Sequence, residues 1–107
     1  MRRYLVVGIG AVLGTLLLAT GIAAMSPPSG RPLYAQKCAI CHGKDGVAKP
    51  PGKGSKNFND PAFQSAWDAE AIAKVTAEGR GKMPAYRSTL RPEEIAAIAA
   101  HVKTLGK

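Results

Sequence analysis

The clearest alternation of apolar and polar positions lies near the C-terminus and predicts an amphipathic helix over residues 92–105. Its apolar residues recur at steps of three and four and form one stripe: Ile95, Ile98, Val102 and Leu105. Pro92 suits the first helical position, and two glutamates follow it, where the positive end of a helix favours them. Gly106 ends the helix. Arg91 is a poor N-cap, so Thr89 is a second candidate for that role.

Two further helices are predicted upstream. One spans residues 32–38, with Pro32 in its first turn. The other spans residues 69–78, with Asp68 as its N-cap and Gly79 at its C-terminal end. The residues expected to face inward are Leu33, Tyr34, Ala71, Ile72 and Val75. Every regular element predicted is helical, so the expected fold class is all-α, with about three to four helices in the domain.

Two segments between these helices show neither a helical nor a strand pattern. Residues 47–61 are rich in Pro, Gly, Lys and Asn, and so long an irregular loop is uncommon unless it packs on a ligand. Residues 79–86 contain two glycines that allow sharp turns, and Pro84 fixes the chain just after Met83. Such a loop can aim one side chain at a fixed point. Three aromatic residues between the two segments are expected in the core: Phe58, Phe63 and Trp67.

Residues 4–25 form an uncharged stretch rich in Leu, Val, Ile and Ala. As a helix rising about 1.5 Å per residue, this stretch would be roughly 33 Å long, enough to cross a hydrocarbon core of about 30 Å. A secretory signal has a shorter apolar region, of about 7–15 residues, and an A-x-A-like cleavage site. No strict A-x-A occurs here. We therefore favour an uncleaved membrane anchor, with a removed signal peptide as the alternative.

The charges that flank this stretch set the expected orientation. Arg2 and Arg3 stay in the cytoplasm, and the remainder of the chain lies on the periplasmic side of the membrane. The predicted organisation is an anchor or signal peptide over residues 1–25, a Pro- and Gly-containing linker over residues 26–30, and one small domain over residues 31–107.

The candidate chemistry lies in Cys38, Cys41 and His42, which form the C-x-x-C-H pattern of covalent haem attachment. Two thiols can add to the two vinyl groups of a porphyrin, and the histidine can reach the iron from the same side. A dithiol redox site expects a βαβ context, and a zinc site needs four ligands, whereas the chain has two cysteines and only one other histidine, His101. A disulfide would close only a tiny loop. We therefore predict one covalently attached haem c, which would also stabilise a domain too small for a large core.

The iron would have a second axial position, for which the candidates are Met83, His101, Met25 and no protein ligand. Met25 belongs to the apolar N-terminal stretch or its edge. His101 lies beside the apolar stripe of the last helix, where a packed histidine is more usual. Met83 lies in the Gly/Pro loop, where a core methionine is less expected. The sequence therefore favours Met83.

The ring N–H of an iron-bound histidine also needs an acceptor. A backbone carbonyl of Pro50 or Pro51, in the long loop after the motif, is expected to serve, and the sequence does not choose between them.

Together these features resemble the class I monohaem c-type cytochromes. The parts of the resemblance, spread over roughly residues 30–107, are Leu33-Tyr34, residues 38–43, Met83-Pro84 and the final amphipathic helix. The resemblance implies that Cys38 and Cys41 carry the haem. It implies that His42 and Met83 are the axial ligands. It also implies that the first and last helices cross beside the haem, where the family often has an aromatic residue and this chain has His101.

The expected function is one-electron transfer outside the cytoplasm between respiratory or photosynthetic partners. Thioether and imidazole ligation raises the potential of a c-type haem, and with both axial positions filled no site remains for oxygen or peroxide. One alternative is an electron-transfer subunit of a larger membrane oxidoreductase. Another is an enzyme or gas sensor with an open axial site.

The positive net charge of the chain bears on which redox partners it could bind. Lys and Arg number 15 against 7 Asp and Glu, a net charge of +8. Lysines near the haem-binding segments form either a positive ring that steers an acidic redox partner or an ordinary solvated surface, and the sequence does not choose between the two. These lysines are Lys37, Lys44, Lys49, Lys53, Lys56 and Lys82. Nucleic-acid binding is not expected, because the domain is exported and carries no recognition motif.

Overall fold

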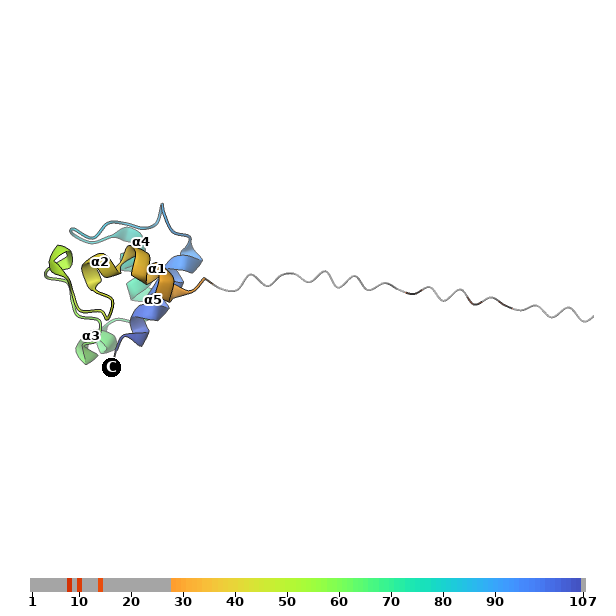
Figure 1. Cartoon of the computed structure of the whole chain (residues 1–107), viewed down its shortest axis with the longest axis horizontal. Coiled ribbons are helices and arrows are strands. Elements are labelled where there is room, and N and C mark those ends of the chain that lie inside the picture. Colours follow the sequence, from red (N-terminus) through yellow and green to blue (C-terminus); the bar gives the residue numbers. More distant parts are fainter. Residues whose placement is uncertain (1–7, 9, 11–13, 15–27, 107) are drawn as a thin grey trace, which may run out of the picture.

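A computed structural model describes residues 28–106 together with Gly8, Gly10 and Gly14, and residues 28–106 form an all-α domain (Figure 1). Along the chain the elements are α1 (Gly30–Lys37), α2 (Ala39–His42), the 3-10 helix η1 (Pro50–Gly52), α3 (Pro61–Ala66), α4 (Ala69–Glu78) and α5 (Pro92–Thr104). The fold class predicted from the sequence is confirmed. In the described part of the chain, β-type pairing is limited to one isolated bridge between Arg80 and Met83.

The described residues include no helix long and apolar enough to cross a membrane. The predicted anchor over residues 4–25 lies outside the described residues, apart from its three glycines.

Helices α4 and α5 match their predicted positions because residues at or beside their ends set where each helix begins and stops. Asp68 caps α4, and its carboxylate accepts a hydrogen bond of 2.8 Å from the Ala71 N–H. At the other end the backbone passes through Gly79 at φ 75°, a conformation that disfavours residues with a Cβ. Helix α5 begins at Pro92, as predicted, and ends at Thr104.

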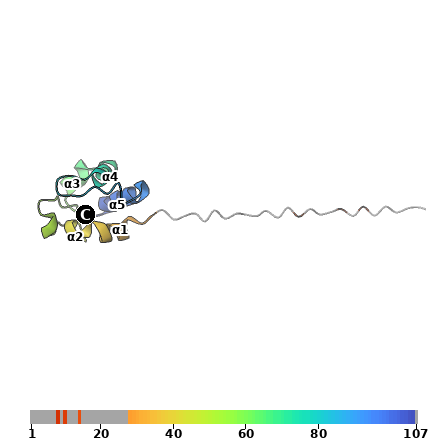
Figure 2. The same cartoon turned by 90° about the horizontal axis from the view of Figure 1, so that it is seen from above.

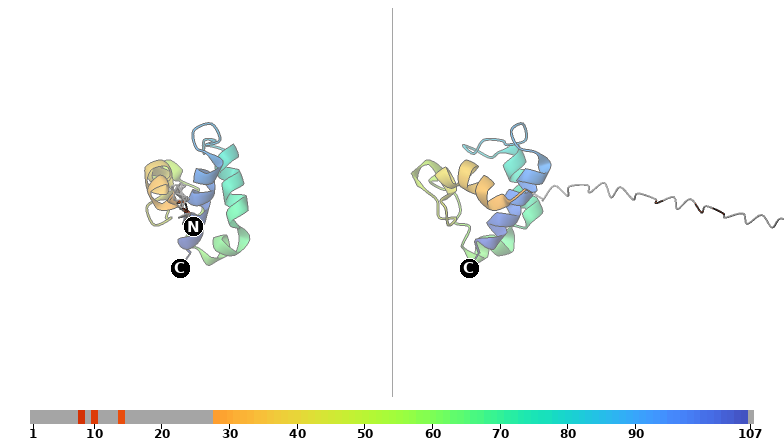
Figure 3. Two further views of the ribbon diagram at one scale, coloured as in Figure 1. Left: turned by 90° about the vertical axis from the view of Figure 1, so that its right-hand side faces the viewer. Right: turned by 45° about the vertical axis from the view of Figure 1, so that its right-hand side comes forward.

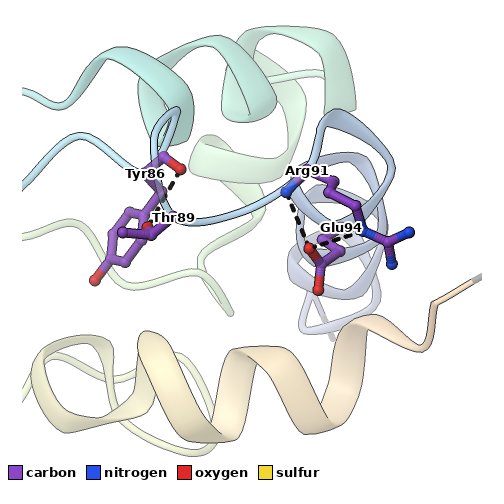
Figure 4. A network of polar contacts seen from close by, with 4 residues as sticks. All are labelled: Tyr86, Thr89, Arg91 and Glu94. Atoms are coloured by element: carbon purple, nitrogen blue, oxygen red, sulfur yellow. Dashed lines mark hydrogen bonds and ion pairs between the residues drawn. The ribbon is translucent and has the colours of Figure 1, made fainter.

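The start of α5 differs from the prediction in its capping group. Arg91 occupies the N-cap position, but the Glu94 carboxylate supplies the polar contact by accepting the Arg91 backbone N–H at 2.9 Å (Figure 4). The hydroxyl of Thr89 donates instead to the Tyr86 carbonyl at 3.3 Å, so Thr89 is not the cap. A side chain in the first turn therefore replaces a good N-cap residue.

Three short elements were not predicted. Helix α2 is only one turn long, and η1 and the first residue of α3 lie in the segment expected to be irregular. For α3 a local signal existed, since Asp60 accepts a 2.9 Å hydrogen bond from the Ala62 N–H and Pro61 occupies the first helical position. Helix α1 also begins earlier than predicted, at Gly30, a residue expected in the linker.

The core forms where α5 packs against α1 and α4, which lie on either side of it (Figures 2 and 3). Its buried members are Tyr34, Cys38, Phe63, Ile72, Leu90, Ile95, Ile98, Ala99 and Val102. Gly30 allows the close approach of α1 to α5, because a Cβ there would overlap the backbone carbonyl of Ala97. His101 lies at this contact, with its ring centroid 5.1 Å from that of Tyr34. The helix pairing implied by the resemblance is therefore present, with a histidine in the aromatic position.

Helix α3 is tied to α5 by two long polar side chains. Lys103 on α5 donates to the carbonyls of Gln64 and Trp67, at 2.6 and 2.8 Å. In return the Gln64 amide donates to the Val102 carbonyl at 3.0 Å. These bonds satisfy carbonyls at the end of α3 and fix the aromatic residues of that segment against the interior.

Candidate haem-binding site

One cavity of about 720 Å³ opens between the helices and loops, and it has the size expected of a cofactor site. All four site residues predicted from the sequence line it: Cys38, Cys41, His42 and Met83. The rejected axial candidate His101 does not line it. Met25, the other rejected candidate, lies outside the described residues.

The C-x-x-C-H segment is positioned by the end of α1 and the single turn of α2. The Cys38 N–H donates to the Tyr34 carbonyl at 2.9 Å, and the His42 N–H donates to the Cys38 carbonyl at the same distance. The chain then turns at Gly43, where φ is 76°, and the Gly43 carbonyl accepts a buried 2.6 Å hydrogen bond from the Tyr34 hydroxyl. A Cβ at Gly43 would overlap the Val47 carbonyl. The motif is thus held tightly at both ends.

Both cysteines are free thiols in the structure, so the alternative of a disulfide is not realised. Cys38 is buried, and its burial, with a smaller contribution from Cys41, raises its thiol pKa to about 11. A protonated thiol in an apolar cavity is a poor metal ligand, because metals bind the thiolate. Among the described residues, no group of three or more His, Cys, Asp or Glu side chains is placed to hold a metal ion.

The imidazole of His42 has the properties of a neutral metal ligand. Burial lowers its pKa, which favours the uncharged ring. The Phe58 ring stacks on it at a centroid distance of 4.8 Å, and its Nδ1 is buried without a hydrogen-bond partner. A buried polar nitrogen left unpaired costs free energy. The neutral imidazole could ligate an iron ion. A hydrogen-bond acceptor for its ring N–H would then fix the orientation of the ring.

The expected proline acceptor is not found. Neither Pro50 nor Pro51 receives a hydrogen bond from the His42 ring. The η1 turn packs on the neighbouring residue instead, because the Lys49 N–H donates to the Cys41 carbonyl at 2.8 Å and a Cβ at Gly52 would overlap that carbonyl. This loop therefore fixes the second cysteine rather than the histidine.

Met83 is presented by a short hairpin-like turn. Its backbone exchanges two hydrogen bonds with Arg80, of 2.9 and 3.1 Å. Gly79 and Gly81 both have positive φ, 75° and 56°, and a Cβ at Gly79 would press on the Met83 carbonyl. The Gly/Pro loop thus does what the sequence suggested, since it turns sharply and directs the partly buried Met83 side chain to the cavity.

Much of the remaining wall is apolar and aromatic. Ring pairs run along it from Phe58 to Phe63, with centroids 4.9 Å apart, and from Phe63 to Trp67, 6.1 Å apart. The expectation that these three residues pack beside the site is borne out. Such a surface suits a flat apolar ring system. Two thiols, a neutral imidazole, a soft thioether and this wall therefore fit a covalently attached haem.

Sequence reasoning missed several cavity residues, among them Arg80, Thr76 and Tyr86. Arg80 lies with its guanidinium 5.8 Å from the Trp67 ring centroid, Thr76 donates its hydroxyl to the Ile72 carbonyl at 2.8 Å, and Tyr86 follows the methionine loop. For Arg80 and Tyr86 the signal was their closeness in sequence to Met83. Thr76 shares the inward face of α4 with Ile72, four residues earlier, and a helical projection could have found it.

The charges on the cavity wall have one sign. Its basic members are Lys37, Lys53, Lys56, Arg80 and Lys82, and none of its residues is acidic. Four of the six lysines considered for a positive ring are among them. Lys44 and Lys49 are exposed but do not line the cavity. We call the five basic residues the basic wall.

A helical frame around an apolar cavity, with a C-x-x-C-H segment on its wall, defines a small c-type cytochrome domain. The chain belongs to the cytochrome c family, since the model of the family described as cytochrome C oxidase, cbb3-type, subunit III matches residues 20–102. It carries a covalently bound haem c.

Relatives of two kinds are similar to this chain. The cytochrome c6 of Anabaena variabilis is 38% identical over 82 residues, which covers 74% of this chain and 88% of that protein. The cbb3-type cytochrome c oxidase subunit FixP of Azorhizobium caulinodans is 37% identical over 78 residues, or 72% of this chain. The chain spans only 26% of the length of that FixP subunit.

A solved structure gives the same fold. The KustC0563 c-type cytochrome superposes with a TM-score of 0.70 at 32% sequence identity, covering 75% of this chain and all of the solved one. The likeness therefore extends over the whole of that cytochrome.

Proposed function

We propose that the domain is a one-electron carrier whose haem is bound through Cys38 and Cys41 and ligated by His42 and Met83. The observation that supports this most directly is that these four side chains, from two segments about forty residues apart in the sequence, line one largely apolar cavity. Ligation by sulfur opposite imidazole stabilises ferrous iron and raises the reduction potential. With both axial positions taken by the protein, the domain transfers electrons and catalyses no bond chemistry.

The test is a visible spectrum of the matured protein in both oxidation states, with the mass of the intact chain. We expect the mass of one haem added to the chain, sulfur ligation in the ferric form, and no binding of carbon monoxide by the ferrous form at neutral pH. Ready binding of carbon monoxide would indicate an open axial position and would favour an enzyme or sensor instead.

We assign the partner-facing surface to the cavity mouth. The exposed residues of the basic wall line the cavity, and Ile40 between the two cysteines is 72% exposed, which is unusual for a large apolar side chain. Apolar contact at the centre with positive charge around it suits a redox protein that presents an acidic rim. The electron would leave the domain through this mouth.

We propose that residues 4–25 tether the domain to the membrane and that the haem domain lies on the periplasmic side. The support is the length and composition of that stretch and the arginines before it. Carbonate washing of membranes tests the tether, since an anchored chain stays with the lipid. Release of a shortened chain would show that the segment is a cleaved signal and the carrier is soluble.

A second candidate function is an electron-transfer subunit of a larger membrane oxidoreductase. The match to a cbb3-type oxidase subunit III and to FixP favours it, whereas similarity to the cytochrome c6 proteins favours a separate carrier. Extraction in a mild detergent followed by size-exclusion chromatography separates the two. A subunit elutes with other haem-containing chains, and a carrier elutes alone.

A further inference from the structure

One side chain joins the methionine loop to the cysteine segment across the cavity mouth. The Tyr86 hydroxyl donates a hydrogen bond of 3.0 Å to the backbone carbonyl of Lys37 (its ring points toward α1 in Figure 4). Lys37 is the last residue of α1 and directly precedes Cys38, while Tyr86 comes three residues after Met83. This is a contact between segments 49 residues apart in sequence.

Both ends of this hydrogen bond are firmly placed. The last carbonyls of a helix have no partner within the helix, so the Lys37 carbonyl is available to an outside donor. Tyr86 is held by its own backbone: its N–H donates to the Thr76 carbonyl of α4 at 3.0 Å, and its carbonyl accepts the Leu90 N–H at 2.9 Å. The phenol therefore connects a rigid α4–α5 corner to the end of α1.

The other contacts of the loop do not make this connection. The Arg80–Met83 bridge is internal to the turn, and the backbone bonds of Tyr86 and Arg87 run to α4. Without the Tyr86 hydroxyl, the described hydrogen bonds of residues 79–87 include none to α1 or α2. The spacing between Met83 and the cysteine segment would then depend on apolar packing alone.

We propose that Tyr86 is a positioning residue for Met83, and that its hydroxyl keeps the methionine loop at the distance from Cys38 at which the sulfur stays on the iron. The proposal rests on the axial ligation by His42 and Met83 proposed above. Tyr86 itself does not bind the iron, and it acts by limiting how far the loop moves away from α1.

The test uses the Tyr86→Phe variant of the full haem-loaded chain, which keeps the ring and removes only the donor. Loss of one hydrogen bond should raise the fraction of molecules with the sulfur off the iron by roughly 2- to 12-fold. Imidazole binds ferric haem only in that sulfur-off form, so its apparent affinity should rise by about the same factor. The measurement is an absorption titration of the ferric protein with imidazole.

Two further variants separate the possible results. Met83→Ala should bind imidazole far more tightly than the unaltered protein, and if it does not, the ligation itself is wrong. Thr104→Val removes an exposed hydroxyl that donates to the His101 carbonyl at 2.6 Å, away from the cavity, and should leave the imidazole affinity unchanged.

The positioning role is refuted if Tyr86→Phe titrates like the unaltered protein while Met83→Ala does not. It is equally refuted if Thr104→Val shifts the affinity as much as Tyr86→Phe, because the effect would then be general loosening.

Discussion

At the scale of single residues, the site depends on side chains whose chemistry is matched to one group. Burial lowers the pKa of His42, which favours the neutral imidazole. A neutral ring and a thioether are both soft or borderline donors suited to ferrous iron.

The residue on which the proposed function depends most is Met83. In Met83→Ala we expect a reduction potential lower by on the order of 0.1 V or more, within the roughly 0.8 V over which axial ligands set haem potentials. The ferrous variant should also bind carbon monoxide. Voltammetry and spectroscopy of the purified variant measure both effects.

Val47→Ala is the matched control for this substitution. Val47 is a 47% exposed apolar residue that does not line the cavity, so its truncation should change neither the potential nor the spectrum. An unaltered potential in Met83→Ala would show that another group holds the second axial position.

At the scale of elements, the packing of α1 on α5 sets the frame that carries the motif. The two helices approach so closely at Gly30 that no side chain fits between that residue and Ala97. From this contact α1 runs directly to Cys38, so a displacement of the helix would move the Cys38 side chain, to which we propose the haem is attached. The approach of two backbones is thus a structural requirement of the site.

Gly30→Ala should destabilise the domain for this reason. The added methyl group overlaps the Ala97 carbonyl, and overpacking of this kind costs about 1–3 kcal/mol. For a domain of this size, each kcal/mol lowers the melting temperature by roughly 4–8 °C. Thermal unfolding followed by circular dichroism is the measurement.

Ser29→Ala is the control for the glycine substitution. Ser29 is exposed, and its side chain makes no capping hydrogen bond, so the melting temperature should stay within about 2 °C. Equal melting temperatures for both variants would mean that the helix contact adjusts without cost.

At the scale of the whole molecule, charge is distributed unevenly with respect to the site. The chain has a net charge of +8, and the cavity wall carries basic residues and no acidic ones. The field at the mouth is therefore positive, and it should speed the approach of negatively charged reactants by about 10-fold or more at low salt.

Small redox ions can test this field without a known partner. Oxidation of the ferrous protein by hexacyanoferrate(III), an anion, should slow as salt rises from about 10 mM to 500 mM, because screening shortens the reach of the field. Reduction by a hexaammineruthenium(II) cation should speed up over the same range. Stopped-flow absorbance measures both rates.

Replacing selected lysines by glutamine shows which charges cause the salt dependence of these rates. Lys53→Gln and Lys56→Gln together should weaken the salt dependence, whereas Lys74→Gln on α4, which is exposed but not on the cavity wall, should leave it nearly unchanged. If the rates of both reactions stay constant as the salt concentration rises, the protein's charge does not steer either ion and the proposed electrostatic steering is wrong.

The sequence alone determined those features that depend on neighbouring residues. Asp68 and Gly79 delimit α4, the spacing of Ile95, Ile98 and Val102 specifies the inward face of α5, and the C-x-x-C-H pattern carries its chemistry within five consecutive residues. Capping, amphipathic periodicity and covalent attachment all act over one or two helical turns, so no tertiary information is needed to recognise them.

Only the tertiary structure decided which distant residues meet. It brought Met83 to the same cavity as the cysteines, turned η1 toward Cys41 instead of His42, and paired the Tyr86 hydroxyl with the Lys37 carbonyl. These contacts follow from how α1 and α4 pack on α5, and that packing depends on the shapes of many side chains at once. No local pattern in the sequence encodes it.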